Sequence, residues 1–174
     1  MTARKPRRYA EDTDVPVGRS REELDQLLVS RGAQQRMIGH DDQNKRAFIQ
    51  FAIDGRQIRL IVRVDTTKLP NPVLNSEQQQ KKVEVPRGWN NWDGSERKQY
   101  YDRKYAQLER ETWRRLVLLT KAKFEQSADE GIEQVFLANV VMTDGQTVYE
   151  FLQPQIKTMY ESGSMPPLLP AHSK

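Results

Sequence analysis

The sequence contains no cysteine and only two histidines among its 174 residues. The absence of cysteine excludes disulfide bonds, thiolate catalysis and zinc or iron–sulfur sites with cysteine ligands. Because histidine is the usual acid–base group near neutral pH, few residues are available for that chemistry. The chain has no run of about 18 apolar residues, and its first residues lack the apolar stretch of a signal peptide. We therefore expect a cytoplasmic protein that neither spans a membrane nor is secreted.

Recognised catalytic motifs are also missing. The chain has no phosphate-binding glycine loop, nucleophile elbow, HExxH pair or EF-hand pattern. His40 stands beside Asp41 and Asp42, a cluster that could hold a metal ion, but no further ligand follows at a recognisable spacing. The other interpretation of these three residues is a polar turn. The sequence therefore predicts no catalytic residue, metal or cofactor, and a small metal-dependent enzyme is only a third alternative.

Apolar residues are few and charged residues many, at 36% and 30% of the chain. This balance predicts one small core with solvated ends. We expect a disordered arm at 1–19, basic and then acidic, a single domain at 20–164 with a long loop at 66–94, and an extended proline-rich tail at 165–174. The net charge of +4 is compatible with an anionic partner, although such a charge also serves solubility.

The strongest pattern is a β-hairpin around Asp54-Gly55. Apolar residues alternate with others on both sides of this pair, and Asp-Gly favours the positive φ angles of a tight hairpin turn. The residues expected to face inward are Ala47, Ile49, Phe51, Ile53, Ile58, Leu60, Val62 and Val64. A third strand is expected at about 34–39, because an isolated hairpin is only marginally stable in water. The opposite face of the hairpin carries three arginines, Arg46, Arg59 and Arg63.

Helices are predicted before and after the three strands along the chain. Ser20 and Glu23 fit a capping box, so we expect a short amphipathic helix over 21–31. Ser95 is the predicted cap of a long helix over 96–128, which contains no glycine or proline. The predicted fold class is therefore α+β, with a three-stranded antiparallel sheet covered by a short N-terminal helix and one long helix.

A helical C-terminal extension is expected after the long helix. Residues 132–142 predict a short helix that runs into an extended end. Thr147 and Glu150 fit a second capping box, which predicts a last helix to about position 161. Pro154 is expected to kink or divide this helix.

Two further groups of residues are candidate contacts for an anionic partner. From Arg114 to Lys123 the long helix has no acidic residue, which leaves a local basic segment. Its members are Arg114, Arg115 and Lys121. In the loop, Arg87 stands near Trp89 and Trp92, whose rings could stack on bases or anchor a partner protein. The alternative is that both tryptophans fold back on the edge of the core.

The order helix, three antiparallel strands, helix is similar in topology to that of double-stranded-RNA-binding domains. Those domains carry a lysine cluster at the start of their last helix, whereas this chain has the segment SERKQ at 95–99. Their RNA-contacting residues are therefore not carried over, because topology alone does not specify function.

A second resemblance rests on four segments, which are SREELDQLL at 20–28, TKAKFE at 120–125, TDGQTV at 143–148 and MPPLLP at 165–170. In these segments the chain resembles small proteins of uncharacterised function that are encoded by bacteriophages and prophages. The resemblance covers about residues 20–170. It implies a phage accessory protein in the bacterial host cytoplasm, acting in DNA metabolism or against host defence.

The preferred interpretation is a non-catalytic protein that binds nucleic acid. The arginines of the sheet, or the basic segment of the long helix, would contact phosphates while Trp89 or Trp92 stacks. The alternative is a protein-binding module that uses the tryptophan loop and the proline-rich C-terminus to inhibit or recruit a host factor, such as a defence or replication protein, or to form a homo-oligomer. The sequence does not distinguish DNA, RNA and protein as targets.

Overall fold

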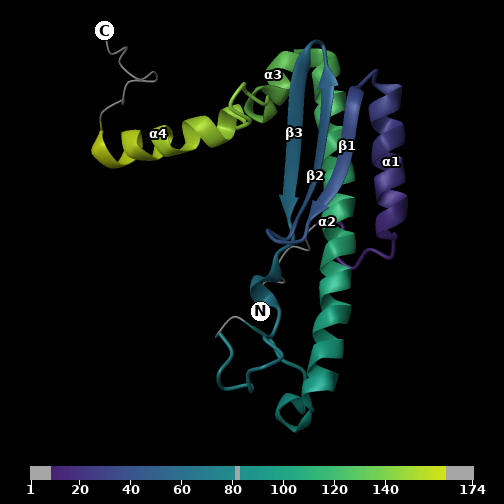
Figure 1. Ribbon diagram of the computed structural model, residues 1–174, viewed down its shortest axis with the longest axis vertical. Helices are drawn as coiled ribbons and strands as arrows, with labels where there is room; N and C mark the ends of the chain where they lie inside the picture. Colours follow the sequence, from purple (N-terminus) through teal and green to yellow (C-terminus); the bar gives the residue numbers. More distant parts are fainter. Residues whose placement is uncertain (1–8, 81–82, 164–174) are drawn as a thin grey trace, which may run out of the picture.

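The computed structural model describes residues 9–80 and 83–163. It has the predicted α+β fold, in which a three-stranded antiparallel sheet lies against two helices and a helical extension follows (Figure 1). The basic residues at 4–8 of the expected arm and the proline-rich tail at 165–174 lie outside the described residues. Residues 9–19 differ from the expected disorder, because Asp12 and Thr13 hydrogen-bond to the long helix and a helix has already begun at Val17.

The sheet has the order β1-β2-β3, with β1 at Gln34–Asp41, β2 at Arg46–Ile53 and β3 at Arg56–Arg63. Asp54 and Gly55 form the predicted turn with φ angles of 48° and 73°, as a two-residue hairpin loop requires. The inward-facing residues form the core of the sheet. Those that are fully or almost fully buried are Ala47, Ile49, Phe51, Ile58 and Leu60.

Strand β1, at one edge of the sheet, is irregular near its start. The register between β1 and β2 shifts between Gln34 and Met37, and Gln35 has a φ angle of 48°. Arg36, which lies within this irregularity, is bound by Asp25 of the N-terminal helix at 2.9 Å. On the opposite edge, Val140 forms a single antiparallel bridge with Ile58 of β3.

Helix α1 spans Val17–Ser30, so it begins earlier than the sequence predicted. The predicted capping box is wrong. Ser20 lies inside the helix and is fully buried, and Pro16 precedes the first turn without a side-chain cap. Glu23 turns toward the long helix and not back to position 20, because two basic side chains of that helix bind its carboxylate.

Helix α2 spans Gly94–Glu130 and is about 55 Å long at 1.5 Å per residue. Its second half packs on the inner face of the sheet, and its first half continues past the end of the sheet (Figure 1). Asp93, and not Ser95, caps the helix, since Asp93 and Glu96 form a complete capping box. Buried residues begin only at Thr112 and continue to Phe124.

The C-terminal region matches the predicted short helix with an extended end. Helix α3 at Ile132–Phe136 leads into the 3-10 helix η3 at Leu137–Asn139 and then into the bridge at Val140. Helix α4 at Val148–Ser162 begins with the predicted capping box of Thr147 and Glu150. Pro154 does not divide it. Figure 1 shows α4 projecting sideways, away from the sheet and α2.

Candidate functional site

The outer face of the sheet carries the three predicted arginines side by side. Arg46 of β2 is paired with Arg63 of β3, and Gln50 is paired with Arg59 four residues further along β2. Between these rungs lies the pair Phe48 and Ile61. Residues two apart on a strand share a face, so the alternation that buries Ile49 and Leu60 turns the three guanidinium groups outward. We call Arg46, Arg59 and Arg63 the arginine face.

A hollow of about 490 Å³ lies between the arginine face and the start of α4. The sheet contributes the three arginines and Ile61, and α4 contributes Tyr149, Glu150 and Gln153. Tyr149 is 55% exposed, so an aromatic ring is available beside the guanidinium groups. This arrangement can bind an anion together with a flat, unsaturated ring.

Two of the three arginines have partners. Arg46 donates through Nε to Asp41 Oδ2 at 2.8 Å. The pKa of Asp41 falls to about 2, first because the Asn44 side chain donates to its carboxylate and also because Arg46 lies beside it. Arg59 donates to Gln50 Oε1 at 3.0 Å and to the Gly145 carbonyl at 3.1 Å. These neutral acceptors orient the Arg59 guanidinium without cancelling its charge.

Arg63 is exposed, and within the described part of the chain its side chain forms no hydrogen bond or ion pair. Glu150 supplies negative charge at the opposite wall of the hollow. The pKa of Glu150 is lowered, first by the backbone N–H of Thr147 and, more weakly, by the charges of Arg59 and Arg46. The hollow therefore keeps an excess of positive charge, with Arg63 as its uncompensated member.

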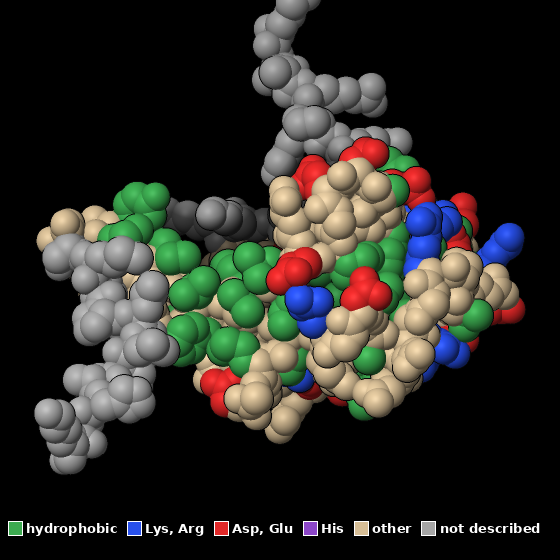
Figure 2. All heavy atoms as spheres, turned by 90° about the horizontal axis from the view of Figure 1, so that it is seen from above, with side chains coloured by type: hydrophobic (Ala, Val, Ile, Leu, Met, Phe, Trp, Pro, Cys, Tyr) green, Lys and Arg blue, Asp and Glu red, His purple; other side chains and the backbone are tan. Residues whose placement is uncertain are grey.

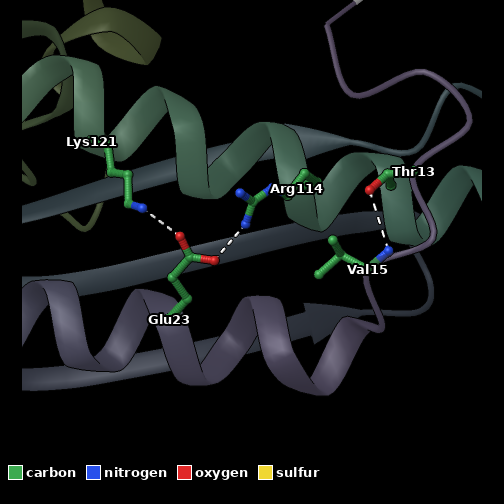
Figure 3. Close-up of polar contacts among 5 residues, drawn as sticks. All are labelled: Thr13, Val15, Glu23, Arg114 and Lys121. Atoms are coloured by element: carbon green, nitrogen blue, oxygen red, sulfur yellow. Dashed lines mark hydrogen bonds and ion pairs between the residues drawn. The ribbon is translucent and has the colours of Figure 1, made fainter.

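The basic segment of α2 does not form a free surface. Arg114 and Lys121 both bind the carboxylate of Glu23, which reaches across from α1 (Figure 3). The pKa of Glu23 is lowered chiefly by the hydrogen bond from Lys121, against the opposing effect of its partial burial. Arg115 donates to Thr112 Oγ1 on its own helix at 3.1 Å. The acidic partner that α2 lacks between Arg114 and Lys123 is thus supplied by Glu23 of α1.

The tryptophan loop folds around its own small core. Trp89 is 1% exposed and donates through Nε1 to the Leu74 carbonyl at 2.9 Å. Its ring lies 5.7 Å from that of Trp92 and 5.9 Å from that of Tyr100, between ring centroids. Trp89 is therefore not available for stacking on a base, but it is buried in this separate cluster and not on the edge of the core, where the alternative placed it. Its contacts are to the first turns of α2 and not to the sheet core.

The remaining loop candidates are more accessible. Trp92 is partly buried, and its ring centroid lies 5.7 Å from that of Tyr100. Arg87 is exposed. Neither residue lines the hollow beside the arginine face, so the structure does not bring the loop and the three arginines into one site.

The His40 cluster is a network at the end of β1. His40 Nδ1 lies 3.1 Å from Asp42 Oδ1 and 3.7 Å from Glu109 Oε1. Asp41 turns to the other side, toward Asn44 and Arg46. Among residues 9–80 and 83–163, no group of three or more acidic or histidine side chains is arranged to hold a metal ion.

A larger hollow of about 790 Å³ lies at the opposite end of the sheet, next to the hairpin turn. Its two arginines are both paired with acidic residues, Arg31 with Glu125 and Arg56 with Glu133. It therefore lacks the uncompensated charge that distinguishes the arginine face.

Sequence reasoning missed the contribution of α4 to the site. The capping box at Thr147 located the start of this helix, but no local pattern indicates that Tyr149 and Gln153 lie opposite the sheet. That placement depends on the bridge between Val140 and β3, a contact between segments about 80 residues apart.

Comparisons with models of known protein families, with curated proteins and with solved structures found no match. The resemblances to phage-encoded proteins and to double-stranded-RNA-binding domains therefore stay predictions. Across the described residues, none of the helices combines the length and apolar character needed to cross a bilayer.

Proposed function

We propose that the protein is a non-catalytic module that binds single-stranded nucleic acid on the arginine face. The observation that carries this proposal is the hollow in which three arginines and the exposed ring of Tyr149 meet. Guanidinium groups suit phosphate oxygens through paired hydrogen bonds. Exposed aromatic rings stack on bases of any sequence, provided that the bases are unpaired.

The proposal assigns different tasks to the members of the site. Arg63 contacts a phosphate directly, because its side chain has no partner among residues 9–80 and 83–163 to give up. Arg59 is held in place by Gln50 and Gly145 and presents a second fixed charge. Arg46 is compensated by Asp41 and contributes less. Binding to phosphates releases counterions, so the affinity falls as the salt concentration rises.

The test is a fluorescence-anisotropy titration with labelled single-stranded DNA and RNA of mixed sequence at low and moderate salt. We expect binding at low salt, and we expect Arg63→Ala to weaken it several-fold and to reduce the salt slope by about 0.7. Tyr149→Ala weakens binding at every salt concentration, because stacking is not electrostatic. Arg19→Ala is the matched control, since Arg19 is exposed on α1 and carries the same charge. Absence of binding at low salt, or equal losses for Arg19→Ala and Arg63→Ala, contradicts the proposal.

A protein-binding role in a host cell is the second candidate. It is favoured by the exposed apolar side chains of α4, while the burial of Trp89 removes one of the anchors expected for it. A pull-down from bacterial lysate after nuclease treatment separates the two functions. A stoichiometric protein partner that survives the nuclease supports the second candidate, and loss of all captured material supports the first. Action in phage DNA metabolism or counter-defence is a part of the proposal that depends on the resemblance alone.

A further inference from the structure

Glu150 is a carboxylate in a hollow that otherwise carries positive charge. The residue is exposed, and it lines the hollow of about 490 Å³ together with Arg46, Arg59 and Arg63. Among residues 148–162, which form α4, it is the only charged residue that does so. Figure 2, a view from above, shows hydrophobic side chains gathered along the arm that α4 forms. Binding of phosphates uses the arginines and gives this carboxylate no task.

The helix cap accounts for only one oxygen of the Glu150 carboxylate. Glu150 Oε2 accepts hydrogen bonds from the backbone N–H of Thr147 at 2.8 Å and from the Thr147 hydroxyl at 2.9 Å. Within the described part of the chain, Oε1 accepts no hydrogen bond, and Glu150 forms no ion pair with an arginine of the hollow. The carboxylate is thus held in place through Oε2, while Oε1 is available to a ligand.

The negative charge of Glu150 persists at neutral pH. The pKa of Glu150 is lowered, first by the backbone N–H of Thr147, and the charges of Arg59 and Arg46 lower it further. An ionised carboxylate only accepts hydrogen bonds, and it repels a phosphate that enters the same hollow. The hollow therefore favours an anionic ligand that also brings a hydrogen-bond donor to Oε1.

Only one of the two kinds of nucleic acid has such a donor on its backbone. Phosphates carry acceptors alone, and deoxyribose within a DNA strand has no hydroxyl group. The ribose of RNA has a 2′-hydroxyl, which donates as well as accepts. In dinucleotide-binding folds an acidic side chain accepts a hydrogen bond from this same hydroxyl. Donors on the base edges are common to DNA and RNA, so they do not distinguish the two.

We propose that Glu150 makes the arginine face selective for single-stranded RNA over single-stranded DNA, because Oε1 accepts a hydrogen bond from a ribose 2′-hydroxyl. The groups of a nucleotide match the walls of the hollow. The base stacks on Tyr149, the ribose lies at the adjacent Glu150, and the phosphate contacts Arg63 of the sheet. This inference rests on the proposed binding of nucleic acid in the same hollow.

Gln153 is the one amide side chain of α4 that lines the hollow, and it does not impose this selection. It is exposed, and an uncharged amide both donates and accepts. It therefore accommodates ribose and deoxyribose alike, without repelling a phosphate. The selection depends on the fixed charge of Glu150.

Two oligonucleotides of one sequence test the selection. Both contain adenine, cytosine and guanine only, so that single-stranded RNA and DNA differ only at the 2′ position. In fluorescence-anisotropy titrations of the full chain at low salt, we expect RNA to bind about tenfold more tightly, because hydrogen bonds to charged groups are among the stronger ones. RNA with fluorine in place of each 2′-hydroxyl keeps the sugar pucker of RNA but has no donor. We expect it to bind like DNA.

Glu150→Gln separates recognition from the helix cap. Glutamine also fits a capping box at this position, so the start of α4 is preserved while the charge that disfavours DNA is lost. The cap uses the amide oxygen and leaves an N–H donor toward the ligand, so we expect RNA and DNA to bind this variant within about twofold of each other. Glu161→Gln is the matched control. It removes the same charge from α4 outside the hollow and keeps the wild-type preference.

The outcomes distinguish the selection from the site itself. Equal binding of RNA and DNA by the wild-type chain overturns the selection by Glu150 and leaves the nucleic-acid site standing. Binding of neither at low salt overturns both. Fluorinated RNA that binds as tightly as RNA also overturns the role of Glu150, because the sugar conformation then accounts for the preference. A preference for RNA that survives Glu150→Gln overturns it as well.

Discussion

The ring of Phe48 lies directly over Gly39 of the neighbouring strand. A Cβ atom at position 39 would lie 2.5 Å from Cζ of Phe48, closer than non-bonded carbon atoms can approach. Phe48 lies between Arg46 and Gln50 on β2. Its ring therefore covers the middle of the outer face of the sheet. The position of the Phe48 ring therefore also shapes the arginine face.

Gly39→Ala is expected to lower the free energy of unfolding by about 1–3 kcal/mol, the usual cost of inserting a methyl group into a filled space. Urea denaturation measures this change. Gly18→Ala is the control, because a Cβ at position 18 of α1 meets nothing within 4 Å. It is expected to stabilise the protein by up to about 1 kcal/mol through helix propensity. Equal effects of the two substitutions contradict the contact.

Glu23→Gln is expected to destabilise the contact between α1 and α2 by about 1 kcal/mol. The change leaves Arg114 and Lys121 without a counter-charge, and the side chains of Glu23 and Arg114 are only 27% and 25% exposed. Lys121 is more exposed, at 43%, so solvent screens its share. Glu22→Gln, next to it on the exposed side of α1, serves as the control and is expected to change stability little. Denaturation at low and high salt tests the electrostatic origin, since the loss should shrink as salt rises.

The stability of the protein is expected to fall as the pH drops from about 4 to about 2. The pKa of Asp41 is about 2 in the folded protein, below its usual 3.8, so its ionised form stabilises the fold above the usual pKa. This contribution is lost as the pH falls through the folded value. Asp41→Asn removes it, so the urea midpoint of the variant should decline less steeply over this range. Parallel curves for the two proteins contradict the assigned role of Asp41.

Trp89→Phe is expected to loosen the tryptophan loop without unfolding the sheet. The substitution removes the hydrogen bond to Leu74 and shrinks a buried ring, at a local cost of about 1–3 kcal/mol. Hydrogen exchange should accelerate in residues 69–93 and stay unchanged in β2 and β3. Trp113→Phe, in the sheet core, is the comparison and should affect the strands. Unchanged exchange in the loop of the Trp89 variant contradicts its role as the anchor.

The parts of the fold that were predicted from sequence depend on neighbours along the chain. The hairpin follows from period-two alternation and a two-residue turn, and the start of α4 follows from residues three apart. The capping box at Ser20 was predicted by the same local logic and is wrong, because the partners of Glu23 are 91 and 98 residues away. The spacing of residues along the chain does not indicate whether Glu23 binds such distant partners or caps a helix.

Only the part of the candidate site that depends on neighbours along the chain was predicted from the sequence. The alternation of the strands correctly places Arg46, Arg59 and Arg63 on one face. It does not indicate that Asp41 compensates Arg46, or that α4 closes one side of the hollow. The burial of Trp89 was left open by the sequence, since it depends on Leu74 and Tyr100, which flank it at distances of 15 and 11 positions.

The irregular edge of β1 limits how the sheet can grow. An added strand needs a straight row of amide and carbonyl groups, and the register shift between Gln34 and Met37 interrupts that row. The ion pair of Arg36 with Asp25 places charge at the same point. An incoming strand would lose hydrogen bonds and solvation there, so edge-to-edge addition is disfavoured at the start of β1.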